Sequence, residues 1–412
     1  MTADSLRGSS ISGTVLARVC LLAFGLAAGI ATARTLGPVG RGQYFAVTTA
    51  AAILAQVANL GLTSSNVFLG ARDPARIRPL LLNSVMLAVA LALLSVLVVT
   101  GWGSRVSTSI GVPRPMLWAV GIIGAATLLW NLGASLLVAT ERFLALNFWQ
   151  VSQGLLALAA IIVCAAVDAT PEAFVLATAL AATATALCQA WFIATRSSGA
   201  MRFSFTLIRS GVGYSSRAYF VLLLGYLLQR SGASLLVAAG NLGELGQFSV
   251  ASQLFDALLI VPGSVSLVLF PLAVRHGQKV WHHVARTAAF TTGGMAALCA
   301  LTALAAPVVV PWVFGARFAE SVVVLWSLLP TVIAYTLVSI LSQYLIARHF
   351  PWSLVVAWGA GLAVALITGF RLTRIYGAVG AALSQSCGAA LVCVLVVAIA
   401  YRRSDRLRRS QS

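Results

Sequence analysis

Three ionisable side chains interrupt long apolar segments of this sequence: Arg18, Arg230 and Asp256. An ionised side chain at the centre of a bilayer costs at least about 2.5 to 3.5 kcal/mol, so it usually faces a water-filled cavity or a partner. Arg230 could attract an anionic substrate, whereas Asp256 could take up a proton or bind a cation during transport. We therefore treat Arg18 and Arg230 as candidate substrate-binding residues and Asp256 as the candidate site of a coupling ion.

The same three residues also allow simpler roles. Arg18 lies near the start of its apolar segment, where a long side chain can reach the headgroups at the membrane surface. Arg230 and Asp256 lie in consecutive segments, and adjacent antiparallel helices would bring them to a similar depth. They could then form an ion pair that only holds two helices together.

Other residues that often carry chemistry show no such pattern. The cysteines are isolated within apolar segments, and none forms the C-x-x-C pair of a zinc or redox site. His276, His282 and His283 share one loop with Lys279, but no carboxylate accompanies them, so a solvated basic loop is expected rather than a metal site. The sequence has no Walker A motif that would bind ATP. We expect no metal, no cofactor and no enzymatic activity.

The composition is that of a membrane protein. Apolar residues make up 60% of the 412 residues, charged residues only 9%, and the mean hydropathy is +0.97. A soluble domain contains about 25% charged residues. The net charge of +18 could suggest a nucleic-acid-binding protein, but most bases lie at the ends of apolar segments. We expect the lipid bilayer as the surrounding medium and no nucleic-acid partner.

Twelve segments are long enough to cross a bilayer as helices. A span needs roughly 20 apolar residues, and each span must satisfy its own backbone hydrogen bonds because lipid offers none. The sequence therefore predicts an all-α integral membrane protein with spans at 11–33, 43–70, 80–101, 116–139, 145–167, 173–195, 218–239, 247–274, 284–314, 322–346, 352–370 and 377–401.

The basic residues predict the orientation of the spans. Cytoplasmic loops are enriched in Lys and Arg, and the richer set of connections holds Arg72, Arg76, Arg78 and the C-terminal run R-R-S-D-R-L-R-R. The poorer set, which includes Arg34 and Arg41, is then outside. Both termini are expected in the cytoplasm of a multi-pass protein of the cytoplasmic membrane. The run A-T-A at 31–33 resembles a signal-peptidase site, but Arg18 interrupts the preceding segment, so we expect this span to be kept.

A short motif occurs twice at nearly half the chain length. Gly42, Gln43 and Tyr44 match Gly246, Gln247 and Phe248, and both triplets lie where the second span of a half begins. An even number of spans in each half makes the two copies parallel, as in many transporters. We expect an N-terminal six-helix lobe at 1–203, a C-terminal six-helix lobe at 204–401 and a basic cytoplasmic tail at 402–412, with a substrate site between the lobes.

Several short motifs resemble those of polysaccharide biosynthesis proteins, the Wzx-type lipid-linked oligosaccharide flippases of the MATE-like exporter superfamily (multidrug/oligosaccharidyl-lipid/polysaccharide, or MOP). They run from one end of the chain to the other: L-G-P-V-G-R-G-Q-Y at 36–44, N-L-G-L-T-S-S-N at 59–66, E-R-F-L-A-L-N at 141–147, G-Q-F-S-V-A-S-Q-L-F-D at 246–256, F-G-A-R-F at 314–318 and Y-G-A-V-G-A-A-L at 376–383.

The resemblance implies a V-shaped bundle of two lobes around a cavity that opens alternately to either side. It also implies a polyprenyl-diphosphate-linked oligosaccharide as cargo and glycan polymerase or glycosyltransferase machinery as partners. Basic cavity residues would hold the diphosphate, and Arg18 and Arg230 match that role in position and type. Many relatives carry an R-x-D pattern in the seventh span, but Arg230 is followed here by Ser231 and Gly232, which leaves Asp256 as the acidic candidate.

Three other functions are consistent with parts of the sequence. A small-molecule or drug exporter of the same superfamily would share the fold, but it would need several acids in its cavity. A major-facilitator transporter also has twelve spans, but the loop G-A-R-D-P-A-R-I-R at 70–78 is a poor match to the motif usual there. A membrane polysaccharide polymerase would need a long outer loop with catalytic residues, and every outer connection here is short.

Overall fold

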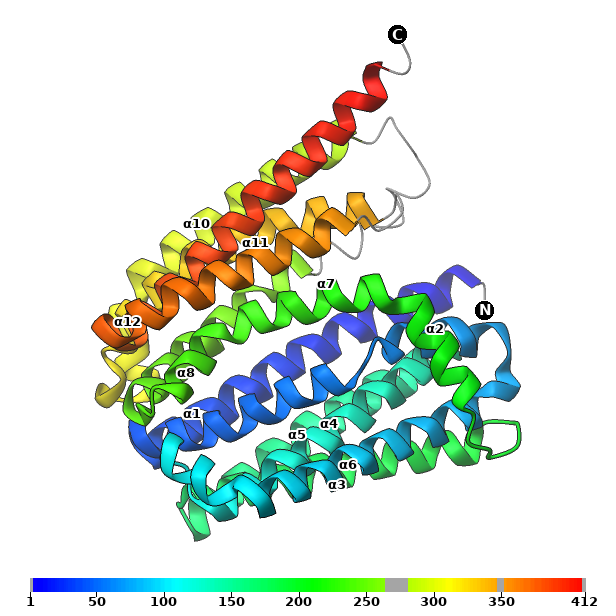
Figure 1. Cartoon of the computed structure of the whole chain (residues 1–412), viewed down its shortest axis with the longest axis horizontal. Coiled ribbons are helices and arrows are strands. Elements are labelled where there is room, and N and C mark those ends of the chain that lie inside the picture. Colours follow the sequence, from blue (N-terminus) through cyan, green and yellow to red (C-terminus); the bar gives the residue numbers. More distant parts are fainter. Residues whose placement is uncertain (1–2, 264–280, 347–351, 410–412) are drawn as a thin grey trace. The chain divides into compact units, whose positions relative to one another are not determined.

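The computed structural model describes residues 3–263, 281–346 and 352–409, and these residues form helices and no strand (Figure 1). The prediction of an all-α membrane protein is confirmed, because ten of the helices are long and apolar enough to cross a membrane. The elements are α1 Ala3–Ala58, α2 Leu62–Arg72, η1 Pro74–Arg76, α3 Ile77–Ile110, α4 Arg114–Ala139, α5 Phe143–Val167, α6 Pro171–Arg196, α7 Phe205–Ala238, α8 Leu242–Leu258, α10 Trp281–Phe314, η3 Ala316–Phe318, α11 Ser321–Ile346 and α12 Trp352–Arg409.

Helix α1 contains a reversal of the chain at Gly37 and Pro38. Gly37 has φ 64° and ψ −176°, which is not helical. The Arg41 guanidinium donates hydrogen bonds to the Gly29 carbonyl and to the Thr32 hydroxyl. Twelve residues of straight helix would separate Arg41 from Gly29 by about 18 Å, so this contact requires the helix to fold back, as Figure 1 shows.

Helix α12 folds back in the same way at Gly377, where φ is 53° and ψ is −130°. A Cβ atom on Gly369 would lie 2.8 Å from the Ser384 hydroxyl oxygen, and one on Gly361 would lie 2.8 Å from the Gly388 carbonyl oxygen. Small residues allow such close helix packing in membranes. Since α1 and α12 each supply two of the predicted spans, the ten long helices account for the twelve predicted spans.

The predicted second span, 43–70, is wrong in its extent. Leu60 and Gly61 have positive φ angles of 49° and 77°, so α1 ends at Ala58 and α2 begins at Leu62. The Asn59 side chain accepts hydrogen bonds from the Thr63 amide and hydroxyl at 3.1 and 2.9 Å and so caps the new helix. The continuous apolar composition hid this break. The predicted eighth span, 247–274, extends beyond the described residues at its C-terminal end.

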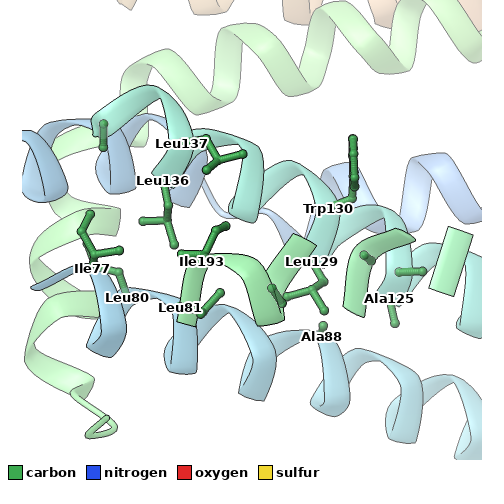
Figure 2. Packing of buried hydrophobic residues seen from close by; sticks show 14 residues of the cluster. Ile77, Leu80, Leu81, Ala88, Ala125, Leu129, Trp130, Leu136, Leu137 and Ile193 are labelled. Carbon is green, nitrogen blue, oxygen red and sulfur yellow. The ribbon is translucent and has the colours of Figure 1, made fainter. Parts of the chain in front are cut away.

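The chain divides into two compact units, Met1–Tyr219 and Phe220–Ser412, with the boundary inside α7. The core of the first unit lies between α3, α4 and α6, where Leu81, Leu129 and Ile193 pack together (Figure 2). In a membrane, dispersion contacts and close packing hold such helices together, because lipid is as apolar as the side chains.

The connection from α6 to α7 is fastened to the first unit. Arg78 donates to the Ala194 and Gly199 carbonyls, each at 3.1 Å. Asn83 donates to the Ser204 carbonyl and accepts from its amide, each at 3.0 Å. The Tyr219 hydroxyl then donates to the Val57 carbonyl at 2.7 Å. The beginning of α7 therefore packs with the first unit, and the boundary falls within α7.

The repeated motif makes the same contact in both units. The Gln43 side-chain amide donates to the Gly111 carbonyl at 3.4 Å, and that of Gln247 donates to the Arg317 carbonyl at 2.7 Å. Each acceptor lies in the connection that follows the third span of its half. Each of these connections begins with a glycine of positive φ, Gly111 at 67° or Gly315 at 106°. The recurring G-Q-aromatic sequence thus ties the start of a second span to the loop after a third span.

Candidate functional site

Arg230 on α7 and Asp256 on α8 form an ion pair, with Arg230 Nη2 2.9 Å from Asp256 Oδ2. The two helices are joined by a tight turn in which Gly240 has a φ of 69°. The Asn241 side chain accepts from the Glu244 amide at 3.2 Å and caps α8. This hairpin brings the two predicted site residues to the same depth, as the sequence indicated.

Three further side chains complete the polar cluster around this pair. Gln229 Nε2 donates to Asp256 Oδ1 at 2.8 Å, and Arg230 Nη1 donates to the Ser252 hydroxyl at 3.3 Å. The guanidinium carbon of Arg230 also lies 5.6 Å from the centre of the Tyr226 ring. Both carboxylate oxygens of Asp256 are therefore hydrogen-bonded.

The ion pair is partly open at the surface of its unit. The side chain of Arg230 is 17% exposed and that of Asp256 is 35% exposed. A sealed pair could serve only to join helices, but a partly exposed pair can also meet a ligand. Two charges that neutralise each other also reduce the cost of keeping either of them within an apolar bundle.

Two aromatic side chains, Tyr335 and Trp358, lie near the pair. The Tyr335 ring on α11 lies 6.3 Å from that of Phe255, the residue before Asp256. The Trp358 ring on α12 lies 5.7 Å from that of Tyr335 and packs against Gly225, one helical turn before Gln229. Helices α7, α8, α11 and α12 thus all contribute to this region of the second unit.

Sequence reasoning missed Gln229, Ser252 and Tyr226. Tyr226 and Ser252 each lie one helical turn before a charged residue, on the same helix face, and such i, i+4 pairs are neighbours. That spacing was the available signal for these two. Gln229 had no comparable signal, because its contact depends on how α8 crosses α7.

Arg18 lies on the first half of α1, in the first unit, and its side chain is exposed. The pair Arg230 and Asp256 belongs to the second unit. That Arg18 shares a ligand with Arg230 stays a prediction.

Arg41 is a buried cation that the sequence placed in an outer connection. The residue is only 5% exposed, and its guanidinium holds the two halves of α1 together through the Thr32 hydroxyl at 2.5 Å. These contacts explain Arg41 as a structural residue of the α1 hairpin. Within the described ranges, no group of three His, Cys, Asp or Glu side chains comes together to hold a metal ion. His276 and His349 lie outside those ranges.

No protein-family model matches the sequence, and no curated protein matches it. Solved structures of transporters are similar in fold. A multidrug resistance MATE family transporter of the MOP superfamily, in an inward-facing conformation, has a TM-score of 0.75 at 14% identity, over 94% of this chain and 96% of its own.

The lipid II flippase MurJ, in an inward closed conformation, has a TM-score of 0.75 at 13% identity, over 94% of this chain and 87% of its own. The Vibrio cholerae MATE transporter VcmN, in a bent form, has a TM-score of 0.62 at 15% identity, over 97% of this chain and 98% of its own. The chain is therefore a multi-pass membrane protein with the fold shared by MATE transporters and MurJ.

Proposed function

We propose that this protein is a flippase that moves a polyprenyl-diphosphate-linked oligosaccharide across the cytoplasmic membrane for polysaccharide biosynthesis. The observation that carries the proposal is the partly exposed pair of Arg230 and Asp256 within the membrane-spanning part of the second unit. The fold shared with MurJ and the short motifs at both ends of the chain support the same class of cargo.

The cargo needs a cationic site because a diphosphate cannot cross hydrocarbon unaided. A guanidinium offers two parallel hydrogen bonds to phosphate and keeps its charge at any physiological pH. In the structure, Asp256 neutralises Arg230. The diphosphate, which carries more charge than a carboxylate, takes the place of Asp256 on the guanidinium, while the polyprenyl chain stays in lipid.

This exchange gives Asp256 a coupling role. Once Arg230 turns to the diphosphate, the carboxylate loses its counter-charge in an apolar surrounding, which favours uptake of a proton or a cation. Cargo binding and ion uptake are then linked at neighbouring atoms. Arg18 supplies a second cation for the same cargo, and the polymerase or glycosyltransferases that make and extend the glycan are the expected partners.

Export of a cationic drug fits the site less well. The MATE transporters with similar folds include multidrug resistance proteins, but a cationic substrate needs a free carboxylate. Both oxygens of Asp256 accept hydrogen bonds from Gln229 and Arg230. The other acids of the sequence lie at or beyond the ends of the spans.

The test is transport of a fluorescent short-chain polyprenyl-diphospho-hexose in proteoliposomes that contain the full chain. The wild type should move the probe between leaflets, and Arg230→Ala should not. A matched probe with a neutral hydroxyl in place of the diphosphate should not be moved by either protein. Equal transport of both probes by the wild type would show that the diphosphate is not recognised and would refute the proposal.

A further inference from the structure

Two buried hydrogen-bond donors next to the ion pair have no partner among the described residues. They are the Tyr335 hydroxyl on α11 and the Trp358 indole Nε1 on α12. The two rings are tilted by 57° with their centres 5.7 Å apart. Tyr335 is only 8% exposed, so water around the protein does not satisfy its hydroxyl.

Unsatisfied buried donors are rare in native proteins because the group loses its hydrogen bonds to water and gains none. Tyr and Trp usually find a partner for the polar end of the ring when the ring is buried. Two such donors side by side therefore indicate an acceptor that binds between or beside them.

The surroundings indicate the charge of that acceptor. The positive charge of Arg230 belongs to the same region, because Arg230 binds Asp256 and the Tyr335 ring lies 6.3 Å from that of the preceding residue, Phe255. The ring of Trp358 packs against Gly225 of α7. The ring of Tyr335 packs near that of Phe255, which directly precedes Asp256 on α8. Asp256, the anionic acceptor of this cluster, already binds Gln229 and Arg230. The region has spare donors and a positive group, so it favours an added anionic oxygen.

We propose that the Tyr335 hydroxyl and the Trp358 indole N–H are neutral donors to phosphate oxygens of the ligand whose charge Arg230 neutralises. This inference rests on the proposed function, because it adds two residues to the diphosphate site. One guanidinium leaves several oxygens of a diphosphate without donors, and two rigid aromatic donors supply hydrogen bonds to them. They also fix the direction from which the phosphate approaches Arg230.

The experiment measures binding of inorganic pyrophosphate to the full chain in lipid nanodiscs by titration calorimetry. Tyr335→Phe removes only the hydroxyl, and Trp358→Phe removes the indole N–H. Each should weaken binding about 10- to 160-fold, the range expected for one lost hydrogen bond to a charged acceptor. Arg230→Ala should remove detectable binding. Tyr376→Phe and Trp326→Phe, which alter exposed aromatic residues of α12 and α11, should bind like the wild type.

The outcomes separate the inference from the proposed function. Suppose that Arg230→Ala abolishes binding while Tyr335→Phe and Trp358→Phe bind like the wild type. The two donors then bond to another acceptor, such as a trapped water, and the inference is wrong. If the wild type binds no pyrophosphate, or Arg230→Ala binds it normally, the diphosphate site itself is refuted. If Tyr335→Phe weakens binding of a hexosyl diphosphate but not of pyrophosphate, the hydroxyl faces the sugar, which also overturns the inference.

Discussion

Gln229 and Arg230 are consecutive residues, yet their side chains donate to different oxygens of one carboxylate, that of Asp256, at 2.8 and 2.9 Å. One turn of α7 thus holds the Asp256 carboxylate by both oxygens. The arrangement fixes the carboxylate in direction and leaves Arg230 with part of its surface exposed. It explains why the two ionised groups can persist within a span and where a competing anion would act.

Replacing Asp256 by Asn should strengthen pyrophosphate binding. Asn cannot neutralise Arg230, so the guanidinium no longer has to exchange a carboxylate for the phosphate, and we expect about 10-fold tighter binding, or about 1.4 kcal/mol. Transport of the lipid-linked probe should fall, because the carboxylate that couples it is gone. Titration calorimetry and the proteoliposome assay measure the two effects. Glu172→Gln, at the start of α6, is the control, and unchanged affinity in Asp256→Asn would contradict the exchange of anions.

Replacing Arg18 or Arg230 by Ala should abolish polymer export without lowering the abundance of the protein in the membrane. Each change removes a cation proposed to hold the diphosphate. Surface polysaccharide and immunoblots of membrane fractions measure the two quantities. Arg105→Ala, an exposed residue of α3, should export normally. Normal polysaccharide in both Arg18→Ala and Arg230→Ala would exclude these cations from the pathway.

The two copies of the repeated glutamine should differ in their contribution to stability. Gln247 donates to the Arg317 carbonyl at 2.7 Å and accepts from the buried Ser321 hydroxyl at 2.6 Å. Gln43 makes one longer contact, 3.4 Å from the Gly111 carbonyl. Gln247→Ala should therefore cost about 1 to 3 kcal/mol of unfolding free energy, and Gln43→Ala less than about 1 kcal/mol. Thermal unfolding in detergent compares the two, and an equal loss would contradict the difference in geometry.

Glu244 should stabilise the second half of α12. Its carboxylate Oε2 accepts from the Ala378 amide at 2.8 Å, directly after the reversal at Gly377. The contact caps an N-terminal amide from a neighbouring helix. Glu244→Ala should cost about 1 kcal/mol, as for other lost N-caps, and should speed hydrogen exchange at Ala378. Glu244→Gln keeps an acceptor oxygen and should lose less. Unchanged exchange at Ala378 in Glu244→Ala would show that the cap is not stabilising.

The sequence predicted the fold class and indicated a similar depth for Arg230 and Asp256, because both depend on local rules; the ion pair itself is shown by the structure. Span length follows from apolar runs, and antiparallel packing of two consecutive spans brings residues of both to a similar depth. Asp256 lies farther along the chain from the turn at Gly240 than Arg230 does, so only the structure shows that the two side chains meet. The offset between the motifs at Gln43 and Gln247 also indicated the repeat. Their common contact with the loop after a third span could not be predicted, since it joins residues far apart in the sequence.

The errors have equally local causes. Leu60 and Gly61 interrupt a run whose composition stays apolar, so hydropathy alone continued the span through them. Arg41 looked like a loop residue because it lies just after Gly37 and Pro38. In the structure Arg41 is buried and binds Thr32 in the preceding half of α1. This contact depends on how the helix folds back at Gly37, which the sequence does not give.

The engagement of both Asp256 oxygens by Gln229 and Arg230 has a consequence for energy conservation in the proposed flippase. In an idle carrier the mid-span carboxylate is already paired with Arg230 and bonded to Gln229, which disfavours the binding of a stray proton or sodium ion. Such a carrier would not dissipate the electrochemical ion gradient between transport cycles. Cargo would have to bind Arg230 before Asp256 could take up an ion. This order of binding would protect the cell against a leak of protons or sodium ions.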